Sequence, residues 1–327
     1  MSVATRPRLG FLGVGWIGRD RMRAVAQSGV AEVVAVADPS EDCRAAALQD
    51  APGAATAEDL DALLAAGVDG VVIATPSALH AEQALATLRA GLPVFCQKPL
   101  GRDAAEARAV VEAARAADVL LGADMSYRAT AAAVALREQL PHIGPVHAAD
   151  LVFHNAYGPD KAWFTDPALS GGGCVIDLGI HLVDLLLWAL GFPAVTGVDA
   201  RLWRQGRPVG EDEVEDLCLA TLDLDGGAVA RLACSWFSHE GRDAIIEATF
   251  RGRDGSLALR NVDGSFYDFV AERHTGTATE VLVAPPDAWG GRAAVAWAER
   301  LAAGARFDPE AEHLVAVAEV LDRVYGR

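Results

Sequence analysis

The stretch Leu9-Gly-Phe-Leu-Gly-Val-Gly-Trp-Ile-Gly18 places three glycines in the spacing Gly-x-Gly-x-x-Gly directly after an apolar run. Such a run is typical of a buried strand, and the residues after the glycines have helical spacing. In a strand–turn–helix unit, Gly13 allows the tight turn, Gly15 lets a pyrophosphate approach the backbone, and Gly18 lets the helix pack on the strand. We interpret residues 9–18 as a phosphate-binding turn at a helix N-terminus.

The next apolar run supports this interpretation. It covers Val33–Ala37 and is followed by Asp38, 20 residues beyond Gly18. An acidic residue at about 20 residues from the glycine motif binds the adenosine ribose hydroxyls of NAD. The Asp38 carboxylate would repel a 2′-phosphate, and no arginine follows it directly. We therefore expect NAD as the cofactor in preference to NADP.

Apolar runs and Ala-rich helical stretches alternate through residue 126. Strands are expected at Leu9–Val14, Val33–Ala37, Gly70–Ala74, Pro93–Cys96 and Val119–Ala123. Helices are expected near 19–28, 40–50, 58–66, 77–90 and 103–117. Apolar strands separated by helices indicate a parallel sheet that is covered on both faces. The pattern predicts an α/β Rossmann domain over residues 1–126 that binds NAD.

From residue 127 the runs become longer and of β type. Strands are expected at Val146–His154, Val195–Trp203, Asp216–Leu224, Ala228–Phe237, Ala244–Phe250 and Ser265–Val270, and helices near 130–140, 174–190, 287–304 and 310–325. Turn signals such as Asp225-Gly226-Gly227 predict antiparallel pairing. We predict an α+β domain over residues 127–327 with a large, mostly antiparallel open sheet, whose C-terminal helix packs back on the first domain.

Composition narrows the class of partner. The formal net charge is −17, and the arginines are scattered along the chain. Negative charge of this size repels nucleic acid phosphates and anionic membrane surfaces. We expect a small-molecule ligand, with neither nucleic acid nor membrane as a partner.

Cysteine usage and the N-terminal run indicate a cytoplasmic protein. The five cysteines are far apart, form no Cys-x-x-Cys pair and have no metal-ligand spacing, so we expect reduced thiols and no metal. The apolar run after Arg8 contains four glycines and lacks a cleavage site, which argues against a signal peptide. No stretch is expected to be apolar over enough residues to span a membrane.

Lys98 is one of two lysines in the chain and follows a predicted strand within Gln97-Lys98-Pro99. An ammonium group can lose its proton and can donate a hydrogen bond to a substrate oxygen, whereas a guanidinium group stays charged. The position therefore favours a chemical role for Lys98. The other lysine, Lys161, lies in a predicted exposed loop, where surface charge is the expected role and a substrate contact is the alternative.

A second candidate cluster follows Gly171-Gly-Gly173. Asp177 and His181 are four residues apart and share one face of the predicted helix. Histidine, with an ordinary pKa near 6.5, can accept a hydroxyl proton. On these residues alone two interpretations stay open: a catalytic pair, or a first-turn acid followed by a core histidine. Asp184, one turn later, is interpreted as structural.

Five motifs together resemble one family. GVGWIG (13–18), VADP (36–39), ATPSALH (74–80), QKP (97–99) and SGGGCVIDLGIHLVDLLLWALG (170–191) are similar, in the same order and spacing, to the Gfo/Idh/MocA oxidoreductases. The likeness implies a Rossmann domain and a second domain whose open sheet forms a homodimer or homotetramer. It implies NAD(P)-linked oxidation or reduction of one carbinol on a sugar, inositol or related cyclic polyol.

The resemblance also implies roles for single residues. Lys98 matches the catalytic lysine, Asp177 a substrate-binding carboxylate and His181 the acid/base, although Lys98 and His181 could exchange roles. Gln97 departs from the family, which typically has glutamate there; loss of that carboxylate removes a stabiliser of the Lys98 ammonium. His80 is expected to pack or cap rather than to catalyse. The implied cofactor contacts are Gly13, Gly15, Trp16, Ile17, Gly18, Asp38, Thr75, Pro76, His80, Gln97 and Lys98.

Candidate substrate residues come from the second domain. They are Tyr127, Arg128, His154, Asn155 and Trp163. Arg128 has a domain-hinge salt bridge as its alternative role, and aromatic rings suit the C–H faces of a pyranose. Two alternative functions remain within the same fold: a glycoside-modifying or glycoside-cleaving enzyme that oxidises the sugar transiently with retained NAD, and a non-catalytic NAD-binding regulator.

Overall fold

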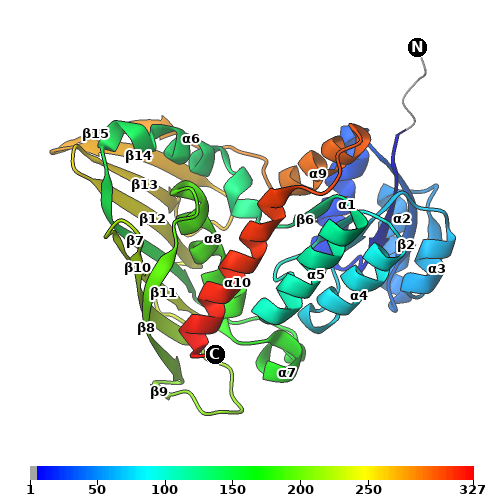
Figure 1. Ribbon diagram of the computed structural model, residues 1–327, viewed down its shortest axis with the longest axis horizontal. Coiled ribbons are helices and arrows are strands. Elements are labelled where there is room, and N and C mark those ends of the chain that lie inside the picture. Colours follow the sequence, from blue (N-terminus) through cyan, green and yellow to red (C-terminus); the bar gives the residue numbers. More distant parts are fainter. Residues whose placement is uncertain (1–5) are drawn as a thin grey trace. The chain divides into compact units, whose positions relative to one another are not determined.

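The computed structural model describes residues 6–327 and separates into two compact units. The first unit runs to Ser126 and also includes Gly290–Val315. The second unit comprises Tyr127–Trp289 and Ala316–Arg327. Figure 1 shows the elements of both units with their labels.

The first unit contains a parallel six-stranded sheet with the order β3-β2-β1-β4-β5-β6. Its strands are β1 (Arg8–Leu12), β2 (Glu32–Ala37), β3 (Ala55–Ala57), β4 (Gly70–Ile73), β5 (Val94–Cys96) and β6 (Leu121–Ala123). Its helices are α1 (Trp16–Ser28), α2 (Glu41–Asp50), α3 (Leu60–Ala65), α4 (Ser77–Arg89), α5 (Ala104–Ala117) and α9 (Arg292–Ala302). This is the doubly wound order of a dinucleotide-binding sheet, so the Rossmann prediction is confirmed.

The strand order reverses between β1 and β4, which is where ligands bind in doubly wound sheets. The glycine motif follows β1, and Thr75 follows β4, so both lie at this switch point. The strands are apolar because both faces are covered: Phe11 and Phe95 are almost completely buried, and Trp297 of α9 packs against Phe95 at a ring distance of 5.8 Å. The switch point is thus supported by a continuous core.

The second unit contains a nine-stranded sheet with the order β15-β14-β13-β12-β7-β11-β10-β8-β9. Its strands are β7 (Val146–Asn155), β8 (Val195–Arg204), β9 (Arg207–Pro208), β10 (Leu217–Leu224), β11 (Val229–Ser235), β12 (Ala244–Gly252), β13 (Ser256–Asn261), β14 (Phe269–Thr275) and β15 (Ala278–Val283). Every pair is antiparallel except β7–β11, which is parallel. The expected mostly antiparallel sheet is confirmed.

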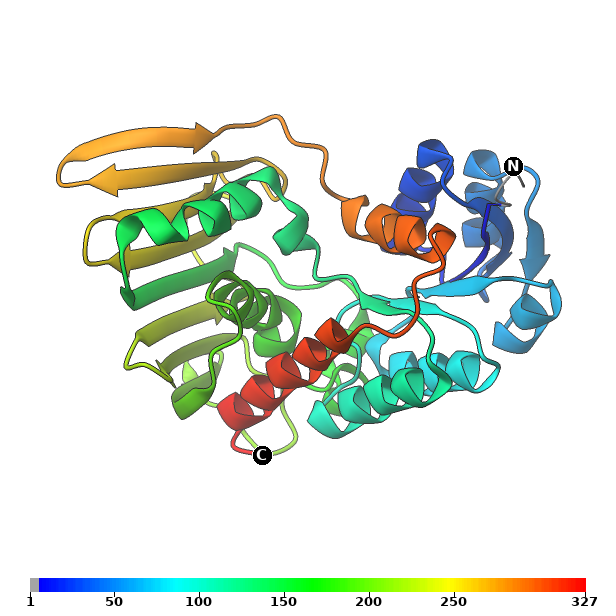
Figure 2. The ribbon, with the colours of Figure 1, turned by 45° about the horizontal axis from the view of Figure 1, so that its top comes forward.

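Helices cover one face of this sheet. The α-helices are α6 (Ala131–Gln139), α7 (Pro167–Ser170) and α8 (Ile180–Ala189), and α10 (Glu312–Tyr325) begins in the first unit and ends in the second. Shorter turns are η1 (Ser126–Ala129), η2 (Leu140–Ile143), η3 (Ala162–Thr165), the π-helical turn η4 (Val175–Gly179) and η5 (Pro309–Ala311). Figure 2 shows α6 lying along the outer strands. Side chains of β10 alternate between buried and exposed, so the opposite face is open to solvent.

The strands differ from the sequence-based expectation in two respects. The strand expected at Ser265–Val270 is wrong, because residues 265–268 form a turn in which the Ser265 hydroxyl accepts hydrogen bonds from two backbone amides, and β14 begins only at Phe269. The strands β3, β9, β13 and β15 were not expected. Three of them, β3, β9 and β15, are edge strands, where the alternating pattern is weak, and β13 is the third strand from an edge.

One segment also contradicts the expected lack of membrane-length apolar stretches. Pro167–Ala189 is long and apolar enough to cross a membrane, but 89% of its most apolar window is buried. Almost every side chain of α8 lies inside the second unit. This burial is that of a core helix that is covered on all sides.

The tight packing of α1 on β1 makes Gly18 sensitive to substitution. A Cβ on Gly18 would lie 2.0 Å from the Gly13 carbonyl oxygen, which belongs to rigid backbone. We expect Gly18→Ala to lower the free energy of unfolding by about 2 kcal/mol or more, since overpacking forces the helix away from the strand. Gly53→Ala is the control, because no atom lies within 4 Å of its added carbon. Equal urea midpoints for the two variants would contradict this packing.

Candidate functional site

The glycine loop of the first unit has the geometry that a bound dinucleotide needs. Gly13 has φ = +83°, and a Cβ there would lie 2.5 Å from the Ala74 carbonyl oxygen. Gly18 touches Gly13 in the same way, whereas no atom lies within 4 Å of a Cβ built on Gly15. Two glycines thus close the turn against the sheet, and the third leaves its backbone open to a phosphate.

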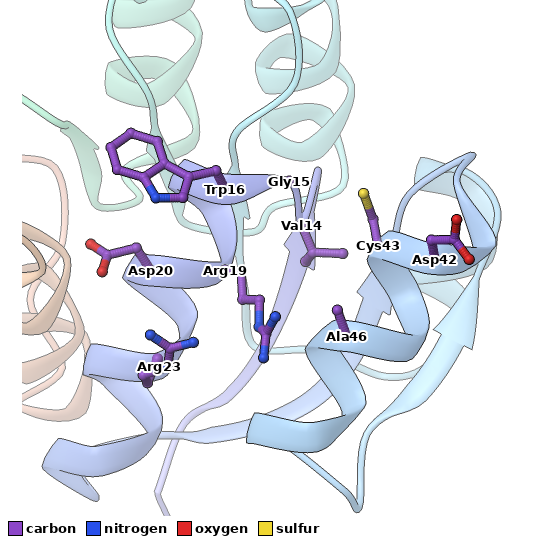
Figure 3. A pocket seen from close by; sticks show the side chains of 9 residues that line it. All are labelled: Val14, Gly15, Trp16, Arg19, Asp20, Arg23, Asp42, Cys43 and Ala46. Atoms are coloured by element: carbon purple, nitrogen blue, oxygen red, sulfur yellow. The ribbon is translucent and has the colours of Figure 1, made fainter.

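A pocket of about 310 Å³ opens beside this loop (Figure 3). It is lined by Val14, Gly15, Trp16, Arg19, Asp20, Arg23, Asp42, Cys43 and Ala46. Arg19 and Arg23 both pair with Asp50, with N–O distances of 2.6 and 3.2 Å. These two arginines hold the pKa of the Asp50 carboxyl below its usual value. One carboxylate thus pairs with both of the guanidinium groups next to the pocket.

Asp38 lies at the carboxyl end of β2 and is held by backbone. Its Oδ2 accepts a hydrogen bond from Val14 N at 3.0 Å, and its Oδ1 accepts one from Ser40 N at 2.9 Å. Each oxygen keeps a further lone pair for a ribose hydroxyl. The Arg44 guanidinium donates to the Asp38 carbonyl oxygen, which brings a positive charge to this end of β2. Sequence analysis did not identify Arg44, because it lies six residues further along, on α2.

His80 joins two loops at the carboxyl edge of the sheet. Its Nε2 lies 2.7 Å from the Thr75 carbonyl oxygen, and its Nδ1 lies 2.7 Å from the Pro99 carbonyl oxygen. Burial lowers the pKa of His80, and the two carbonyl acceptors oppose that effect. The side chain is almost completely buried. Its contacts are those of a bridging residue that ties the loop after β4 to the segment after Lys98.

Gln97 has an unexpected partner. Its Nε2 donates to Asp124 Oδ2 at 2.5 Å, and Arg21 Nε donates to the same oxygen at 2.7 Å. Asp124 is 1% exposed. Its buried carboxylate forms an ion pair with the Arg21 guanidinium, which is also buried. The other oxygen, Oδ1, is buried and has no hydrogen-bond partner within residues 6–327. Position 97 therefore carries an amide, and the carboxylate next to it belongs to Asp124, which follows the neighbouring strand β6.

In the second unit, Asp177 and His181 lie on one continuous helical segment. Asp177 belongs to the π-helical turn η4, and His181 belongs to the first turn of α8. π-helical turns occur frequently at functional sites because they change which face a side chain presents. Trp236 at the end of β11 donates its indole N–H to Asp177 Oδ2 at 3.1 Å. Trp236 therefore orients this carboxylate, and sequence analysis missed it because no motif contains it.

Aromatic rings surround His181. The ring of Tyr127 lies 4.7 Å from the His181 ring, and Phe153 lies 6.3 Å from it. Tyr127 also contacts Phe269 and Trp289, at 5.7 and 5.2 Å. The imidazole is thus held by apolar ring contacts and is 9% exposed. Tyr127 thus lies beside His181 in the second unit.

Arg128 is engaged elsewhere in the second unit. Its Nε donates to Asp184 Oδ2 at 2.7 Å, and its guanidinium lies 5.2 Å from the centre of the Phe192 ring. Asp184 is buried, so this charge pair fixes α8 rather than leaving Arg128 open to a ligand. The geometry favours the salt-bridge role over the substrate role, and it agrees with the structural interpretation of Asp184.

The remaining candidates lie near the end of β7 and in the following loop. His154 Nδ1 lies 2.7 Å from Ser235 Oγ, and burial lowers the pKa of His154. Asn155 Oδ1 is buried and has no hydrogen-bond partner within residues 6–327. Trp163 stacks on Phe164 at 3.8 Å. Of these, Asn155 offers an acceptor that a substrate hydroxyl could fill.

The candidate residues are divided between the units. Lys98, after β5, belongs to the first unit with the glycine loop, whereas Asp177 and His181 belong to the second. Lys161 is exposed. All five cysteines are free, and no group of three or more His, Cys, Asp or Glu side chains in the described part of the chain has metal-binding geometry. Burial raises the pKa of Cys174 to about 12, so this thiol stays protonated.

Comparisons with known proteins agree with this arrangement. Residues 7–125 match the family model described as an oxidoreductase family with an NAD-binding Rossmann fold, and residues 139–258 match the model of the GFO/IDH/MocA C-terminal domain. A protein of Amycolatopsis mediterranei (strain S699), named as a proposed UDP-kanosamine synthase oxidoreductase subunit, is 35% identical over 272 residues. That alignment covers 77% of this chain and 75% of the relative.

Two further proteins are similar over most of their length. The 1,5-anhydro-D-fructose reductase of Ensifer adhaerens is 31% identical over 262 residues, which covers 78% of this chain and 76% of the reductase. The crystal structure of GenD2 from gentamicin A biosynthesis, in complex with NAD, has a TM-score of 0.81 at 26% identity. It covers 98% of this chain and 94% of GenD2.

A substitution at Gly15 should weaken NAD binding without changing the stability of the fold. Because its φ of −62° suits any residue and no atom lies within 4 Å, we expect Gly15→Ala to change the free energy of unfolding by less than about 0.5 kcal/mol. The added methyl occupies the space where a phosphate approaches, so NAD should bind at least about tenfold more weakly. Calorimetric titration with NAD measures this, and undiminished affinity would contradict phosphate binding at Gly15.

Proposed function

Because the chain belongs to the Gfo/Idh/MocA family of NAD(P)-dependent sugar and polyol oxidoreductases, we propose that it transfers a hydride between nicotinamide and one secondary alcohol or ketone of a cyclic sugar, inositol or related polyol. The observation that carries the proposal is the pair Asp177 and His181 on one buried segment, with Asp177 oriented by Trp236. A carboxylate and an imidazole in this relation can bind one hydroxyl and accept its proton.

The cofactor is proposed to bind along the carboxyl edge of the first sheet. Its pyrophosphate lies at Gly15, its adenosine ribose is held by Asp38, and the loops joined by His80 border the remainder. The bound dinucleotide supplies the hydride acceptor or donor. We propose NAD in preference to NADP, since the Asp38 carboxylate repels a 2′-phosphate and the arginines beside the pocket are already engaged by Asp50.

Three side chains act on the substrate in this proposal. His181 accepts the hydroxyl proton at a ring nitrogen during oxidation and returns it to the oxygen during reduction. The Lys98 ammonium donates a hydrogen bond to the same oxygen and stabilises negative charge that develops there. Asp177 accepts a hydrogen bond from a substrate hydroxyl and so orients the ring. Lys98 and His181 remain interchangeable as the acid/base.

The second unit offers further groups suited to a polyhydroxylated ring. The Asn155 amide oxygen is a buried acceptor, and the Tyr127 and Trp163 rings can pack against C–H groups. Relatives named for an anhydro sugar and for a nucleotide-linked amino sugar support a cyclic sugar as the substrate. A glycoside or nucleotide-linked sugar is included in the proposed class.

We also propose a homodimer or homotetramer in the cytoplasm. Leu219 and Val229 are 47% and 38% exposed on the open face of the nine-stranded sheet, and the register places both on that face. Exposed apolar residues on an uncovered sheet face suit a self-complementary interface. Five free thiols fit a reducing compartment. A monomer by light scattering would contradict the assembly.

An absorbance screen at a wavelength specific to reduced nicotinamide tests the proposal. Purified protein is offered NAD or NADP with inositols, free sugars, glycosides and nucleotide-linked sugars. Reduction of the cofactor with one stereochemical group supports the dehydrogenase. Glycoside cleavage with no net cofactor release would instead favour transient oxidation with retained NAD, and binding of NAD without any turnover would favour a regulator.

Lys98 can be tested against the other lysine of the chain. We expect Lys98→Met to reduce kcat by at least about a hundredfold, because the variant loses the donor to the reacting oxygen, while NAD affinity stays within about threefold. Lys161→Met is the matched control, since Lys161 is exposed, and it should keep wild-type turnover. Single-substrate kinetics and NAD titration measure both effects. Retained turnover in Lys98→Met would end this assignment.

Cofactor choice depends on the two charges at the end of β2. We expect Asp38→Ser to raise the ratio of NADP to NAD affinity by at least about tenfold, because the substitution removes the carboxylate that repels the 2′-phosphate and leaves Arg44 beside it. Adding Arg44→Ala should reverse that gain. Fluorescence titrations with both cofactors measure the ratio, and an unchanged ratio in Asp38→Ser would remove Asp38 from the cofactor site.

A further inference from the structure

A buried carboxylate outside every motif contacts the segment that carries Asp177 and His181. Glu215 is 1% exposed and lies just before β10. Its Oε1 accepts hydrogen bonds from Val175 N at 2.8 Å and from Gly173 N at 3.1 Å, and its Oε2 accepts from Gly173 N at 3.0 Å. The hydrogen bonds satisfy backbone N–H groups at the start of a helical segment, which otherwise have no acceptor.

A third donor comes from the C-terminal helix. Tyr325 donates its hydroxyl hydrogen to Glu215 Oε1 at 2.9 Å. Arg327 stacks on the Tyr325 ring at 4.5 Å and donates to the Gly171 carbonyl oxygen at 2.6 Å. Residues from two separate stretches of the second unit therefore converge on the glycine loop that precedes η4.

The glycines of this loop are required by the same contacts. A Cβ on Gly172 would lie 2.0 Å from the Tyr325 hydroxyl oxygen, and one on Gly173 would lie 1.9 Å from the Glu215 carbonyl oxygen. The Glu215 carbonyl also accepts a hydrogen bond from Cys174 N at 3.1 Å. The carboxylate and the backbone of Glu215 thus hold consecutive residues of the loop, which leaves it little freedom to shift along the sheet.

We propose that Glu215, supported by Tyr325, is a positioning residue that sets the location of Asp177 and His181. This inference rests on the proposed function of those two residues. Val175 is two residues before Asp177, so displacement of its amide moves the turn from which the Asp177 carboxylate projects. A catalytic group displaced by about 1 Å commonly loses a large part of its effect. Glu215 itself touches neither substrate nor cofactor in this proposal.

Burial raises the pKa of the Glu215 carboxyl, whereas the hydrogen bonds from Val175, Tyr325 and Gly173 oppose that effect. All three partners donate hydrogen bonds to Glu215, so this position favours a carboxylate, whose two oxygens act only as acceptors. Glutamine has nearly the same shape but presents one amide NH₂ to these donors. Glu215→Gln is therefore a small substitution with a specific defect: with its oxygen at the Oε1 position, its NH₂ group faces the Gly173 amide at the Oε2 position.

The test compares Glu215→Gln with Glu213→Gln. Glu213 lies two residues earlier and pairs with Arg207 at the surface, so the control makes the same chemical change outside the buried cluster. We expect Glu215→Gln to lower kcat at least about tenfold, with kcat expressed per NAD-binding site and NAD affinity unchanged. Glu213→Gln should keep wild-type kcat. A purely structural defect would instead unfold the second unit, which circular dichroism of Glu215→Gln against Glu213→Gln would detect.

Tyr325→Phe keeps the test valid if Glu215→Gln folds poorly. Removal of the hydroxyl leaves the ring and two of the donors, so kcat should fall roughly threefold. In the double variant the Tyr325 substitution should add nothing to Glu215→Gln, because the hydroxyl acts through that carboxylate. Additive effects would overturn the link between Tyr325 and Glu215, and kcat within twofold of wild type in Glu215→Gln would overturn the proposal.

Hydrogen exchange separates this inference from the proposed function. If Glu215 holds the loop, the amides of Gly173 and Val175 exchange at least about tenfold faster in Glu215→Gln than in Glu213→Gln. Equal exchange rates would overturn the proposal whatever the enzyme catalyses. Retained turnover in His181→Ala would instead refute His181 as the acid/base. It would not affect the exchange result, which tests only whether Glu215 holds the glycine loop.

Discussion

The close approach of α1 to β1 is the constraint on which the first unit depends. Gly18 rests against the Gly13 carbonyl, and Gly13 rests against the loop after β4, so three backbone segments meet without intervening side chains. This contact brings the N-terminus of α1 to the switch point of the sheet, where its free N–H groups face the open position at Gly15. The buried side chains of Phe11, Phe95 and their neighbours pack beneath that edge of the sheet.

The second unit also holds its candidate residues through a close backbone contact, but with different partners. Its glycine loop also brings backbone into close contact, but here a buried carboxylate and a tyrosine hydroxyl supply the partners. The apolar surroundings make α8 a core helix, so Asp177 and His181 project from a segment that is rigid along most of its length. Trp236 and the Tyr127 ring then orient the two side chains individually.

Much of the fold could be predicted because periodicity and glycine spacing are local properties. The parallel sheet, its helices and the glycine turn follow from runs such as Val33–Ala37 and from the motif after β1. The turn at Ser265 and the parallel pairing of β7 with β11 could not, because both depend on hydrogen bonds with partners chosen by tertiary structure. For the same reason the sequence pointed to Asp177 and Gln97 but not to their partners, Trp236 and Asp124, which lie 59 and 27 residues away.

The pairing of Gln97 with Asp124 makes the two positions depend on each other. Gln97 and the buried Arg21 both donate to the same Asp124 oxygen, and Arg21 also pairs with Asp20. A glutamate at position 97 would place a second carboxylate, in place of an amide donor, against the buried Asp124 oxygen, and burial makes repulsion between like charges costly. Substitutions at these two positions are therefore coupled. An amide donor at position 97 and a carboxylate at position 124 thus form one electrostatic unit, which a change at either position disrupts.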